Sequence, residues 1–406
     1  MEAINNIVSM LNGPIWGVGM LVLIVGSGLY FTIRLGFFQF VHFKDMWSRI
    51  IDKSESESGI SSFASFCTTM AMRVGTGNVA GVAVALYMGG PGALFWMWLA
   101  AFFGMATKYA EGCLAVKYRQ VDDNGNIAGG PMYYIEMGLG KKWKPLAVLF
   151  AFFGCMVALL GSGTTTQMNA IISSVEAGFG ISTYITCAVI TVLVAIITFG
   201  GLQSIAKAAE KIVPAMAVIY FVITVIFLAL NAGGLPGAIS QVFTGAFSGT
   251  AAAGGFAGAG VMLAMRSGIA RGLFSNESGL GSAPIVAAAA KTKWPAEQGL
   301  ISMTGTFIDT IIICTLTGLT IVVSGEWLKG LNGAALTNAA FQDAFPAVGG
   351  YMLMVGLVLF AFTTILGWNY YGERCWEYLF GTKSILFYRV LFLVILASAA
   401  FLKLES

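Results

Sequence analysis

The sequence predicts an all-α protein that crosses a membrane many times. Of its 406 residues, 57% are hydrophobic and only 10% are charged, whereas soluble domains carry about 25% charged residues. Apolar runs of roughly 20 residues, the length that crosses a hydrocarbon core, recur along the whole chain. These runs are continuous and do not alternate with polar residues, so a transmembrane β-barrel is not expected.

The apolar runs give the expected elements in order. We expect ten membrane segments, at about 14–33, 62–87, 92–116, 146–174, 183–200, 212–230, 250–290, 298–323, 346–370 and 385–402. The polar stretch 36–58 begins with an amphipathic pattern that suits a membrane interface and continues as a solvated linker. Within the third segment, Lys108 and Glu111 lie three residues apart on one helix face, where they can pair.

The loop lysines and arginines gather on one side of the predicted membrane. With the N-terminus placed outside, only Lys329 and Lys403 fall outside with it, and the other loop cations face the cytoplasm. The positive-inside rule therefore predicts a multi-pass protein of the cell (plasma) membrane with an outside N-terminus. The first apolar run lacks a small-residue cleavage pattern, which indicates a retained helix and not a signal peptide.

Composition also excludes several functions. The net charge of +3 is small and the basic residues are dispersed, so no nucleic acid partner is expected. The six cysteines show no CxxC spacing, which argues against a disulfide framework or a zinc site. With His42 as the single histidine, neither an enzyme nor an enzymatic cofactor is expected.

Two of the segments are interrupted in the same way. One carries VGTGN at Val74–Asn78, and the other, too long for a single crossing, carries ARGLFSNESG at Ala270–Gly279. Four segments separate them, so each would open a five-helix half, and the two halves would enter the membrane from opposite sides. This pattern predicts an inverted-repeat transporter, with a leading helix and linker at 1–60, a first repeat at 61–235 and a second at 236–406.

The first interruption has a chemical purpose in this interpretation. Unwound backbone in hydrocarbon costs several kcal/mol per unpaired group, but freed amides can meet a carboxylate and freed carbonyls a small cation. Gly75 and Gly77 let the backbone turn and a ligand approach, and Thr76 and Asn78 add polar side chains. Helix packing through Gly77 and Gly81 stays open as an alternative, whereas a dinucleotide-binding loop lacks its parallel sheet.

The second interruption supplies further candidates. The residues expected to line cargo there are Gly272, Phe274, Ser275 and Asn276. Arg271 and Glu277 are polar at membrane depth, where such groups are usually functional, but mutual neutralisation is the favoured interpretation for them. Asp309 in the eighth segment is a weaker candidate for a cation ligand or a substrate contact, because it can instead neutralise Arg266 or Arg271.

Several blocks of the chain carry a family resemblance. The stretches RVGTGNVAGVA, GGPGALFWMW, GGPMYYIEMGLG, EKIVPAMAVIY, RGLFSNESGLGSAP and FTTILGWNYYGE resemble the signature blocks of the alanine or glycine:cation symporter family (sodium:alanine symporters). The resemblance spans nearly the whole chain. It implies sodium-coupled import of small neutral amino acids, and a LeuT-type five-plus-five inverted repeat behind one extra N-terminal helix.

The resemblance also implies a substrate site. The amides of Thr76 and Gly77 would meet the substrate carboxylate, and Asn78 would help to hold substrate or ion. Gln167 would hydrogen-bond to the amino acid, unless it forms an interhelical packing bond. Trp368 would wall off the side-chain pocket and keep it small, unless it is an interfacial anchor.

The coupling ion has an implied site as well. The carbonyls of Ala71 and Val74, with the hydroxyls of Thr363 and Thr364, resemble the sodium site shared across this fold, and such oxygens suit a hard cation. The hydroxyls can alternatively bond their own helix backbone, as those of Ser and Thr within membranes often do.

We therefore expect a sodium-driven symporter that binds sodium and alanine or glycine in the lipid bilayer and works by alternating access. The alternative is a transporter of the same fold with a different amino acid cargo or with proton coupling. A channel would need a continuous polar pore, whereas the polar residues here cluster at two breaks. The family pattern has an eleventh crossing, whereas the tenth expected segment ends just before Ser406. We therefore expect the last core helix of the fold to be missing from this sequence.

Overall fold

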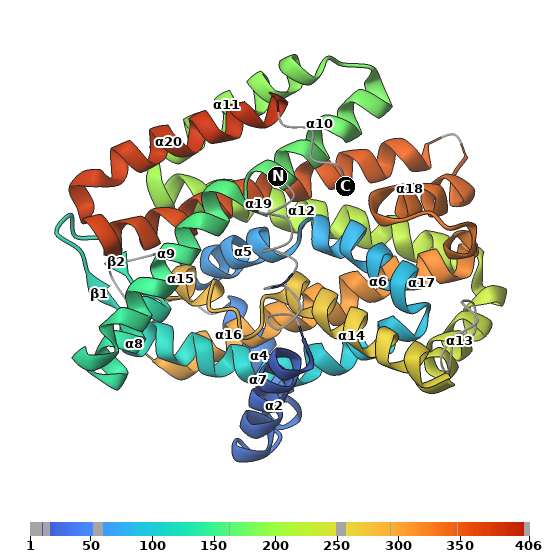
Figure 1. Ribbon diagram of the computed structural model, residues 1–406, viewed down its shortest axis with the longest axis horizontal. Helices are drawn as coiled ribbons and strands as arrows, with labels where there is room; N and C mark the ends of the chain where they lie inside the picture. Colours follow the sequence, from blue (N-terminus) through green and yellow to red (C-terminus); the bar gives the residue numbers. More distant parts are fainter. Residues whose placement is uncertain are drawn as a thin grey trace.

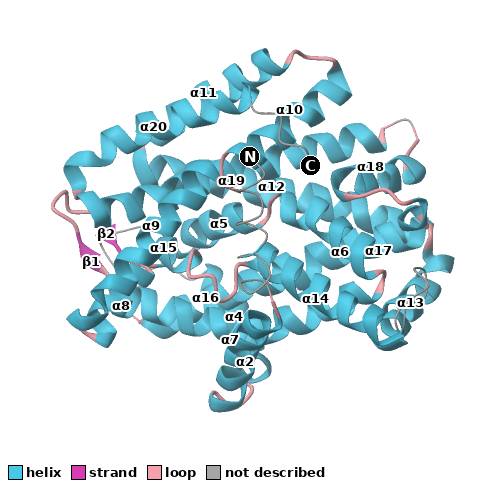
Figure 2. Ribbon diagram, in the orientation of Figure 1, coloured by secondary structure: helices cyan, strands magenta, loops and turns pink. Residues whose placement is uncertain are grey.

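The computed structural model describes residues 10, 17–51, 60–161, 163–248, 257–292, 294–346 and 348–401. The predicted linker residues 52–59 and the predicted start of the seventh segment, 250–256, lie outside these residues. Figure 2 shows that the described chain is almost entirely helical, with one pair of short strands. The expectation of an all-α architecture is confirmed.

The first half of the chain contains the leading helix and the first broken helix. Its elements are α2 (Val18–Arg34), α3 (Phe38–Val41), α4 (Phe43–Ile51), α5 (Ser62–Arg73), the π-helix η1 (Gly77–Gly81), α6 (Val82–Gly89), α7 (Gly92–Lys117), β1 (Gln120–Val121), β2 (Ile127–Ala128), α8 (Pro131–Leu139), η2 (Lys141–Trp143), α9 (Lys144–Leu160), α10 (Thr165–Phe179), α11 (Thr183–Phe199) and α12 (Gly201–Leu230). The segment expected at 146–174 is divided, because α9 ends at Leu160 and α10 begins at Thr165.

The second half contains the other broken helix. Its elements are η3 (Ala232–Gly234), α13 (Leu235–Ser248), α14 (Ala257–Asn276), α15 (Ala283–Ala287), α16 (Pro295–Thr306), the π-helix η5 (Phe307–Cys314), α17 (Thr315–Ser324), η6 (Glu326–Lys329), α18 (Gly333–Ala344), α19 (Gly349–Phe380), η7 (Thr382–Ser384), α20 (Ile385–Ser398) and η8 (Ala399–Phe401). The helix expected at 346–370 extends to Phe380, one of several boundaries that differ from expectation.

The long helices run side by side across the view of Figure 1. The β1–β2 hairpin and α8 lie at the left end of this view, called here the hairpin end, and α13 and α18 lie at the right end, called the α18 end. Five helical stretches among the described residues are long and apolar enough to cross a membrane. They are Lys141–Phe179, which combines η2, α9 and α10, and Gly201–Leu230, Pro295–Ser324, Gly349–Phe380 and Thr382–Phe401. The chain is therefore a helical membrane protein.

The two broken helices lie antiparallel in the middle of the bundle. At the hairpin end, the chain entering α5 pairs with the chain leaving α15, because Ile60 bridges to Ala290 in parallel register. At the α18 end, α6 packs closely on α14, where a Cβ added to Gly89 would lie 2.3 Å from Ser267 Oγ. In Figure 1 both breaks consequently fall near the centre of the molecule.

Two helices at the α18 end occupy stretches that the sequence analysis left between membrane segments. Helix α13 buries Val242 and helix α18 buries Leu336 and Ala340, all fully. These side chains join one apolar cluster with residues of α6 and α7. Both helices are too short to cross a membrane, and they cover the end of the bundle.

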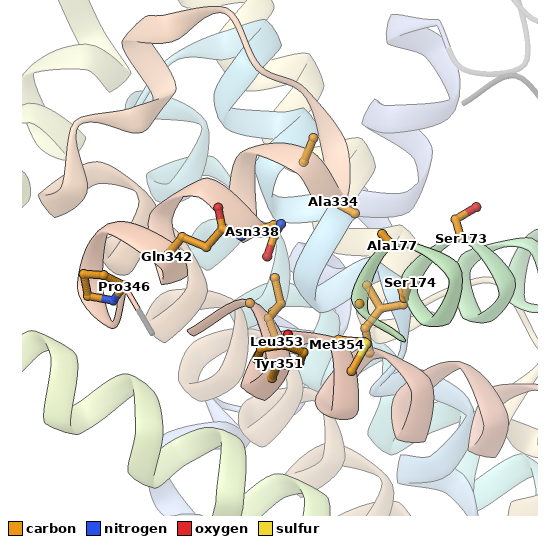
Figure 3. A pocket seen from close by; sticks show the side chains of 14 residues that line it. Ser173, Ser174, Ala177, Ala334, Asn338, Gln342, Pro346, Tyr351, Leu353 and Met354 are labelled. Atoms are coloured by element: carbon orange, nitrogen blue, oxygen red, sulfur yellow. The ribbon is translucent and has the colours of Figure 1, made fainter. Parts of the chain in front are cut away.

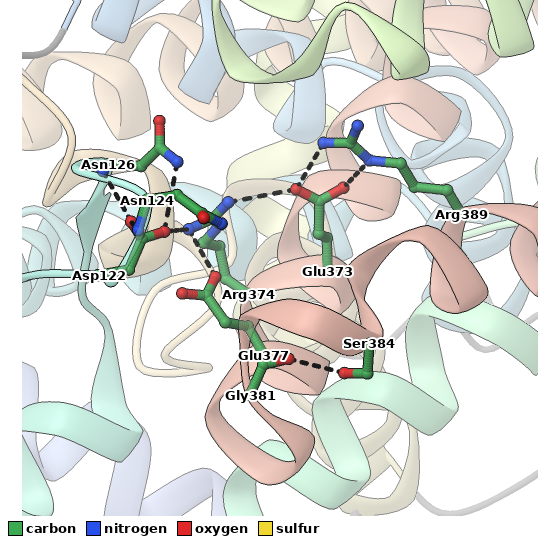
Figure 4. Close-up of polar contacts among 9 residues, drawn as sticks. All are labelled: Asp122, Asn124, Asn126, Glu373, Arg374, Glu377, Gly381, Ser384 and Arg389. Atoms are coloured by element: carbon green, nitrogen blue, oxygen red, sulfur yellow. Dashed lines mark hydrogen bonds and ion pairs between the residues drawn. The ribbon is translucent and has the colours of Figure 1, made fainter.

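A network of charged side chains ties the hairpin to α19 at the hairpin end (Figure 4). Arg374 lies 3.2 Å from Asp122 in the hairpin, 3.2 Å from Glu373 and 2.5 Å from Glu377. Glu373 in turn pairs with Arg389 of α20 at 2.6 Å. The five side chains of this network are mostly buried, so the network joins the hairpin, α19 and α20 into one unit.

Removing the Asp122 carboxylate tests this network. Burial alone would raise the pKa of Asp122, but hydrogen bonds from the backbone of Asn126, from Arg374 and from the backbone of Asn124 hold the pKa below its ordinary value. We expect Asp122→Asn to lower stability by about 1–3 kcal/mol, the scale of hydrogen bonds to charged groups, with a reduced melting temperature in detergent as the measurement.

The lowered pKa of Asp122 fixes how its contribution to stability changes with pH. A depressed folded pKa means that the contribution of Asp122 is complete above its ordinary value of 3.8 and is lost as pH falls through the folded value. The difference in stability between the natural chain and Asp122→Asn should therefore shrink as the pH falls into the acid range. The exposed neighbour Asp123 provides the control, Asp123→Asn. An equal loss in both variants would contradict a specific role for Asp122.

Candidate functional site

The first break leaves backbone groups without their helical partners. Helix α5 ends at Arg73, Val74 is extended, and the helix resumes at Thr76. The N–H of Gly75 is recovered by the side chain of Asn78, whose Oδ1 accepts it at 2.9 Å. Thr76 and Gly77 then stand at the start of the resumed helix, where N–H groups have no intrahelical acceptor and the helix dipole favours negative charge.

The second break is paired from within the protein. It begins at Glu277, inside the expected range Ala270–Gly279, because Arg271–Asn276 still belong to α14. The N–H of Ser278 donates to Asn276 Oδ1 at 2.9 Å, and the N–H of Gly281 donates to Glu111 Oε1 at 3.1 Å. Side chains thus satisfy freed amides at this break.

A buried carboxylate links both breaks. Asp309 lies in the π-helix η5 and is fully buried. Its Oδ1 accepts from Asn78 Nδ2 at 2.7 Å, and its Oδ2 accepts from Ser275 Oγ at 2.8 Å and from Thr310 Oγ1 at 2.9 Å. Asn276 joins through Thr310 at 3.1 Å. We call these five residues the Asp309 hub, and it fastens the first and second broken helices to η5.

A cavity of about 420 Å³ lies beside the first break. We call it the central cavity. It is lined by Met72, Arg73, Gly75, Thr76, Gly77, Phe150, Phe153, Gly154, Val157, Gln167, Phe274, Glu277, Leu280, Ser282, Ile285, Thr364, Trp368, Tyr371 and Cys375. Both broken helices, α9, α10 and α19 therefore contribute to one cavity, and its wall is mostly apolar with a few polar groups, as is usual for small-molecule sites.

The cavity brings together several residues singled out by sequence. Gln167 Nε2 donates to Thr76 Oγ1 at 3.1 Å, which joins α10 to the first break. A Cβ on Gly77 would lie 3.4 Å from the ring of Phe274, so this glycine lets the two broken helices meet closely. The ring of Trp368 stands edge-on to that of Tyr371, 5.3 Å between centroids, and forms part of the wall.

The expected ion ligands are only partly grouped. Thr364 Oγ1 lies 3.3 Å from the Ala71 carbonyl and 2.8 Å from the Phe360 carbonyl, and a Cβ on Gly75 would lie 2.6 Å from it. Thr363 Oγ1 also bonds to the Phe360 carbonyl, at 3.1 Å. The Phe360 carbonyl was not expected from sequence, because a backbone oxygen leaves no trace in residue type. In the described chain, neither threonine hydroxyl bonds to the Val74 carbonyl.

Four predicted cargo residues do not line the central cavity. Asn78, Ser275 and Asn276 belong to the Asp309 hub, where other side chains use their hydrogen-bonding groups. Gly272 faces α7, because a Cβ there would lie 3.3 Å from Met97 Cα. The lining residues Arg73 and Glu277, by contrast, were not chosen as site residues. Their only sequence signal is that they are charged residues beside a break.

The expected neutralisation of Glu277 by Arg271 is wrong. Arg271 is partly exposed and lies over the ring of Phe274, 6.0 Å from its centroid. No ion pair joins either arginine, Arg271 or Arg266, to Asp309 in the described chain. The geometric reason is that Glu277 turns away from α14 at the break, where its φ is +56°. The expected Lys108–Glu111 pair is present, at 2.8 Å.

A second cavity, of about 470 Å³, lies at the α18 end (Figure 3). Ser173 and Ser174 of α10, Asn338 and Gln342 of α18, and Leu357 of α19 are among its lining residues. Along α10 and α19 the two cavities are six to seven residues apart, or about 10 Å at 1.5 Å per residue. A thin packed layer that includes fully buried Phe360 separates them.

Discontinuous helices crossing at a central cavity define a class, the transporters with broken-helix sites. Solved transporter structures of the LeuT fold are similar to this chain in overall fold. MhsT in complex with L-phenylalanine has a TM-score of 0.61 at 13% identity and covers 85% of this chain and 80% of its own. The Eremococcus coleocola manganese transporter has a TM-score of 0.54 at 12% identity, over 86% and 74%. At such identities the likeness shows the fold alone.

The chain belongs to the sodium:alanine symporter family, whose pattern it matches over residues 1–406. It is 48% identical to the sodium/alanine symporter AgcS of Methanococcus maripaludis, over 96% of this chain and 87% of that protein. An uncharacterized transporter of Haemophilus influenzae is 51% identical, over 99% and 88%. The amino-acid carrier protein AlsT of Bacillus subtilis is 38% identical, over 95% and 81%. The chain is thus an amino-acid symporter and not an enzyme.

Crowding at Gly75 gives a test of the first break. A Cβ there would displace the Thr364 hydroxyl, so we expect Gly75→Ala to cost about 1–3 kcal/mol, as overpacking does, and to lower the melting temperature in detergent. A methyl group on Gly81, in the same broken helix, would meet nothing within 4 Å, so Gly81→Ala should be nearly neutral. Similar melting temperatures for the two variants would contradict the close contact at Gly75.

Proposed function

We propose that the protein is a sodium-coupled symporter that imports small neutral amino acids, alanine and glycine, across the plasma membrane with its N-terminus outside. The observation that carries the proposal is the meeting, at the first break, of unpaired helix-start amides with a group of neutral oxygens. The amides at Thr76 and Gly77 suit a carboxylate, and the oxygens around Thr364 suit a small cation. Family membership supports the same assignment.

The substrate would sit with its carboxylate against the first break. Thr76 and Gly77 line the central cavity, and the amides at the start of a helix are favourable donors to an anion. Gln167 is hydrogen-bonded to Thr76 and can orient that end of the ligand. Trp368 and Phe274 provide apolar wall for the substrate side chain, which favours cargo with a small side chain.

Sodium would be held by neutral oxygens. Within the described chain, no three His, Cys, Asp or Glu side chains converge on one point, so an ion here depends on carbonyl and hydroxyl oxygens. The Ala71 and Phe360 carbonyls already surround Thr364 Oγ1, and Thr363 shares Phe360. A hard cation accepts such ligands, and the Val74 carbonyl is the remaining candidate from the same break.

The two ligands would be coupled through the first break itself. Gly75 touches Thr364 and is followed directly by Thr76 and Gly77, so an ion at Thr364 and a carboxylate at Gly77 share one short strand of backbone. Each would hold this segment in the conformation that the other needs, and their charges attract. Such linkage is reciprocal: sodium raises substrate affinity, and substrate raises sodium affinity by the same factor.

Transport would proceed by alternating access. The central cavity reaches Cys375 toward the hairpin end, and the second cavity reaches Gln342 at the α18 end. The layer between them is thin, so a modest rearrangement of α10 and α19 would transfer access from one to the other. The same architecture suits a different amino acid or proton coupling, which remains the alternative.

Asp309 stays a weaker candidate ion ligand. Its carboxylate is fully buried, and no cationic side chain lies within ion-pair distance in the described part of the chain. Its hydrogen bonds to Asn78, Ser275 and Thr310 also give it a purely structural role as the centre of the hub. For Asp309 to bind a sodium ion, some of these hydroxyl and amide groups would have to turn their oxygens toward that ion.

Replacing sodium by choline tests the coupling. We expect the affinity for labelled alanine to fall by roughly 5–150-fold, the usual range of a coupling free energy, when binding to purified protein is measured at constant ionic strength. Potassium serves as a second comparison, and a proton gradient is imposed separately in proteoliposomes. Unchanged affinity without sodium, with uptake driven by the proton gradient, would establish the alternative.

Thr364→Val tests the ion site. Losing one oxygen ligand should raise the sodium concentration for half-maximal alanine binding by about tenfold, an energy typical of a hydrogen bond to a charged group, while alanine affinity at saturating sodium changes little. Thr363→Val is the comparison within the proposed site. The Thr363 hydroxyl bonds to carbonyls of its own helix, at Leu359 and Phe360, whereas the Thr364 hydroxyl also bonds to the Ala71 carbonyl of α5, so we expect a smaller rise in Thr363→Val. An unchanged sodium requirement in Thr364→Val would remove that residue from the site.

A further inference from the structure

Two charges of opposite sign face the central cavity, and the proposed substrate and sodium sites use neither. Arg73 is the last residue of α5, and Glu277 is the first residue after α14. Both line the central cavity, with only 2% and 3% of their surfaces exposed. They are the charged residues among its lining, and charges at membrane depth are usually functional.

The antiparallel arrangement puts both charges on the same side of the breaks. Helix α5 approaches its break from the hairpin end, whereas α14 approaches from the α18 end (Figure 1). Arg73 precedes the first break and Glu277 follows the second, so both lie on the hairpin side of Thr76 and Phe274. Beyond them the cavity continues past Leu280 toward the hairpin end.

Neither charge has an ion partner in the described chain. Arg73 Nη1 donates to the carbonyl of Ser302 at 3.2 Å, and its Nε and Nη2 donate to no group. Glu277 Oε2 accepts from Ser282 Oγ at 2.8 Å and from Tyr371 OH at 3.4 Å, and Oε1 has no such bond. The nearby Lys108 already pairs with Glu111. One guanidinium and one carboxylate therefore keep unused hydrogen-bonding capacity.

The backbone at Glu277 supports a role for its side chain. Its φ of +56° is in the left-handed region, which glycine adopts without cost and other residues adopt at roughly 1–3 kcal/mol. Such strain tends to cluster at functional sites. A glycine would relieve the backbone, and a glutamate at this position instead presents a carboxylate to the cavity.

We infer that the hairpin side of the central cavity holds a second amino-acid position, in which Arg73 receives the α-carboxylate and Glu277 the α-ammonium of the substrate. The inference rests on the proposed function, because it takes a zwitterion as the cargo. A single guanidinium and a single carboxylate complement the two charges of a zwitterion, and charge-assisted hydrogen bonds are the strong ones. The position would serve release toward the hairpin end.

The physical need for this position is desolvation. A zwitterion that leaves the amides of Thr76 and Gly77 must part from compensating groups before it reaches water, and unpaired charges in a dry cavity are costly. Arg73 and Glu277 would replace those groups in the next part of the cavity. The volume of about 420 Å³ is more than a six-heavy-atom amino acid fills, so there is room for a second position.

The test compares Glu277→Gln and Arg73→Gln with Arg266→Gln as the control. Arg266 lies on α14, the helix that precedes the second break, but it lines a separate groove with Leu21 and Trp96. We measure sodium-dependent equilibrium binding of labelled alanine, and its rate of release from preloaded protein in proteoliposomes. Both cavity variants should slow release by about tenfold, which corresponds to the energy of one charge-assisted hydrogen bond. Their affinity for alanine should stay within about twofold of that of the natural chain. The control Arg266→Gln should change neither the release rate nor the affinity.

The outcomes separate the two proposals. If release from both cavity variants is unchanged, the second position does not exist. If the affinity for alanine falls by as large a factor as the release rate, the two charges belong to the proposed substrate site at Thr76 and Gly77, and the inference is overturned. If the natural chain itself binds no alanine in sodium, the proposed function fails instead. Glu277→Asp keeps the charge and should restore more of the release rate than Glu277→Gln, which a merely structural role would not require.

A second measurement remains valid if those variants do not fold. Leu280, half-buried, lines the cavity beyond the two charges, and Leu280→Cys places a thiol there. A small neutral thiol reagent should modify this cysteine more slowly when alanine is raised well above the concentration that saturates the main site, with the natural chain as the background for native cysteines. Lactate, which lacks the ammonium, should not protect. Equal protection by lactate, or none by alanine, would overturn the inference.

Discussion

A helix that opens inside a membrane must find new partners for the N–H and C=O groups it gives up, and this constraint organises the centre of the protein. At the second break the partners are side chains, Asn276 for Ser278 and Glu111 for Gly281. At the first break, Asn78 recovers the amide of Gly75. The helix-start amides that follow Gly75 lie at the central cavity. The backbone N–H groups that lack a partner are therefore located where a substrate could bind.

The same constraint explains why so many polar residues gather near the breaks without touching the cavity. The Asp309 hub joins one residue of the first broken helix and two of the second to a single buried carboxylate. A fully satisfied polar network in a low-dielectric interior is stiff and specific. Its effect is to hold the crossing of the two broken helices at a fixed separation, where Gly77 lies against the ring of Phe274.

The sequence was sufficient to predict the helical membrane class and the existence of both breaks, because apolar run length and glycine-rich interruptions are local signals. It did not predict that α9 and α10 are separate, that α13 and α18 cover the end of the bundle, or that the second break starts at Glu277. These depend on packing between elements, which residue order does not encode directly.

The candidate site shows the same division. Thr76, Gly77 and Gln167 were identified from sequence and line the cavity, whereas Ser275 and Asn276, equally polar, point into the hub. Helical periodicity assigns a residue to a face of its own helix but does not say which neighbour that face meets. For the same reason Arg73 and Glu277 were not expected in the cavity wall, and the Phe360 carbonyl was not visible at all.

Helix α19 is a single uninterrupted rod of 32 residues, and it carries Thr364 near its middle and Arg374 near its end. From Thr364 to Phe380 it extends about 24 Å, so a tilt of roughly 10° about Thr364 would swing its tip by about 4 Å. The charged network at the tip would carry the hairpin and α20 with it. An ion bound to a few oxygens near the middle of the membrane could thereby produce a larger displacement at the protein surface, because α19 acts as a lever arm.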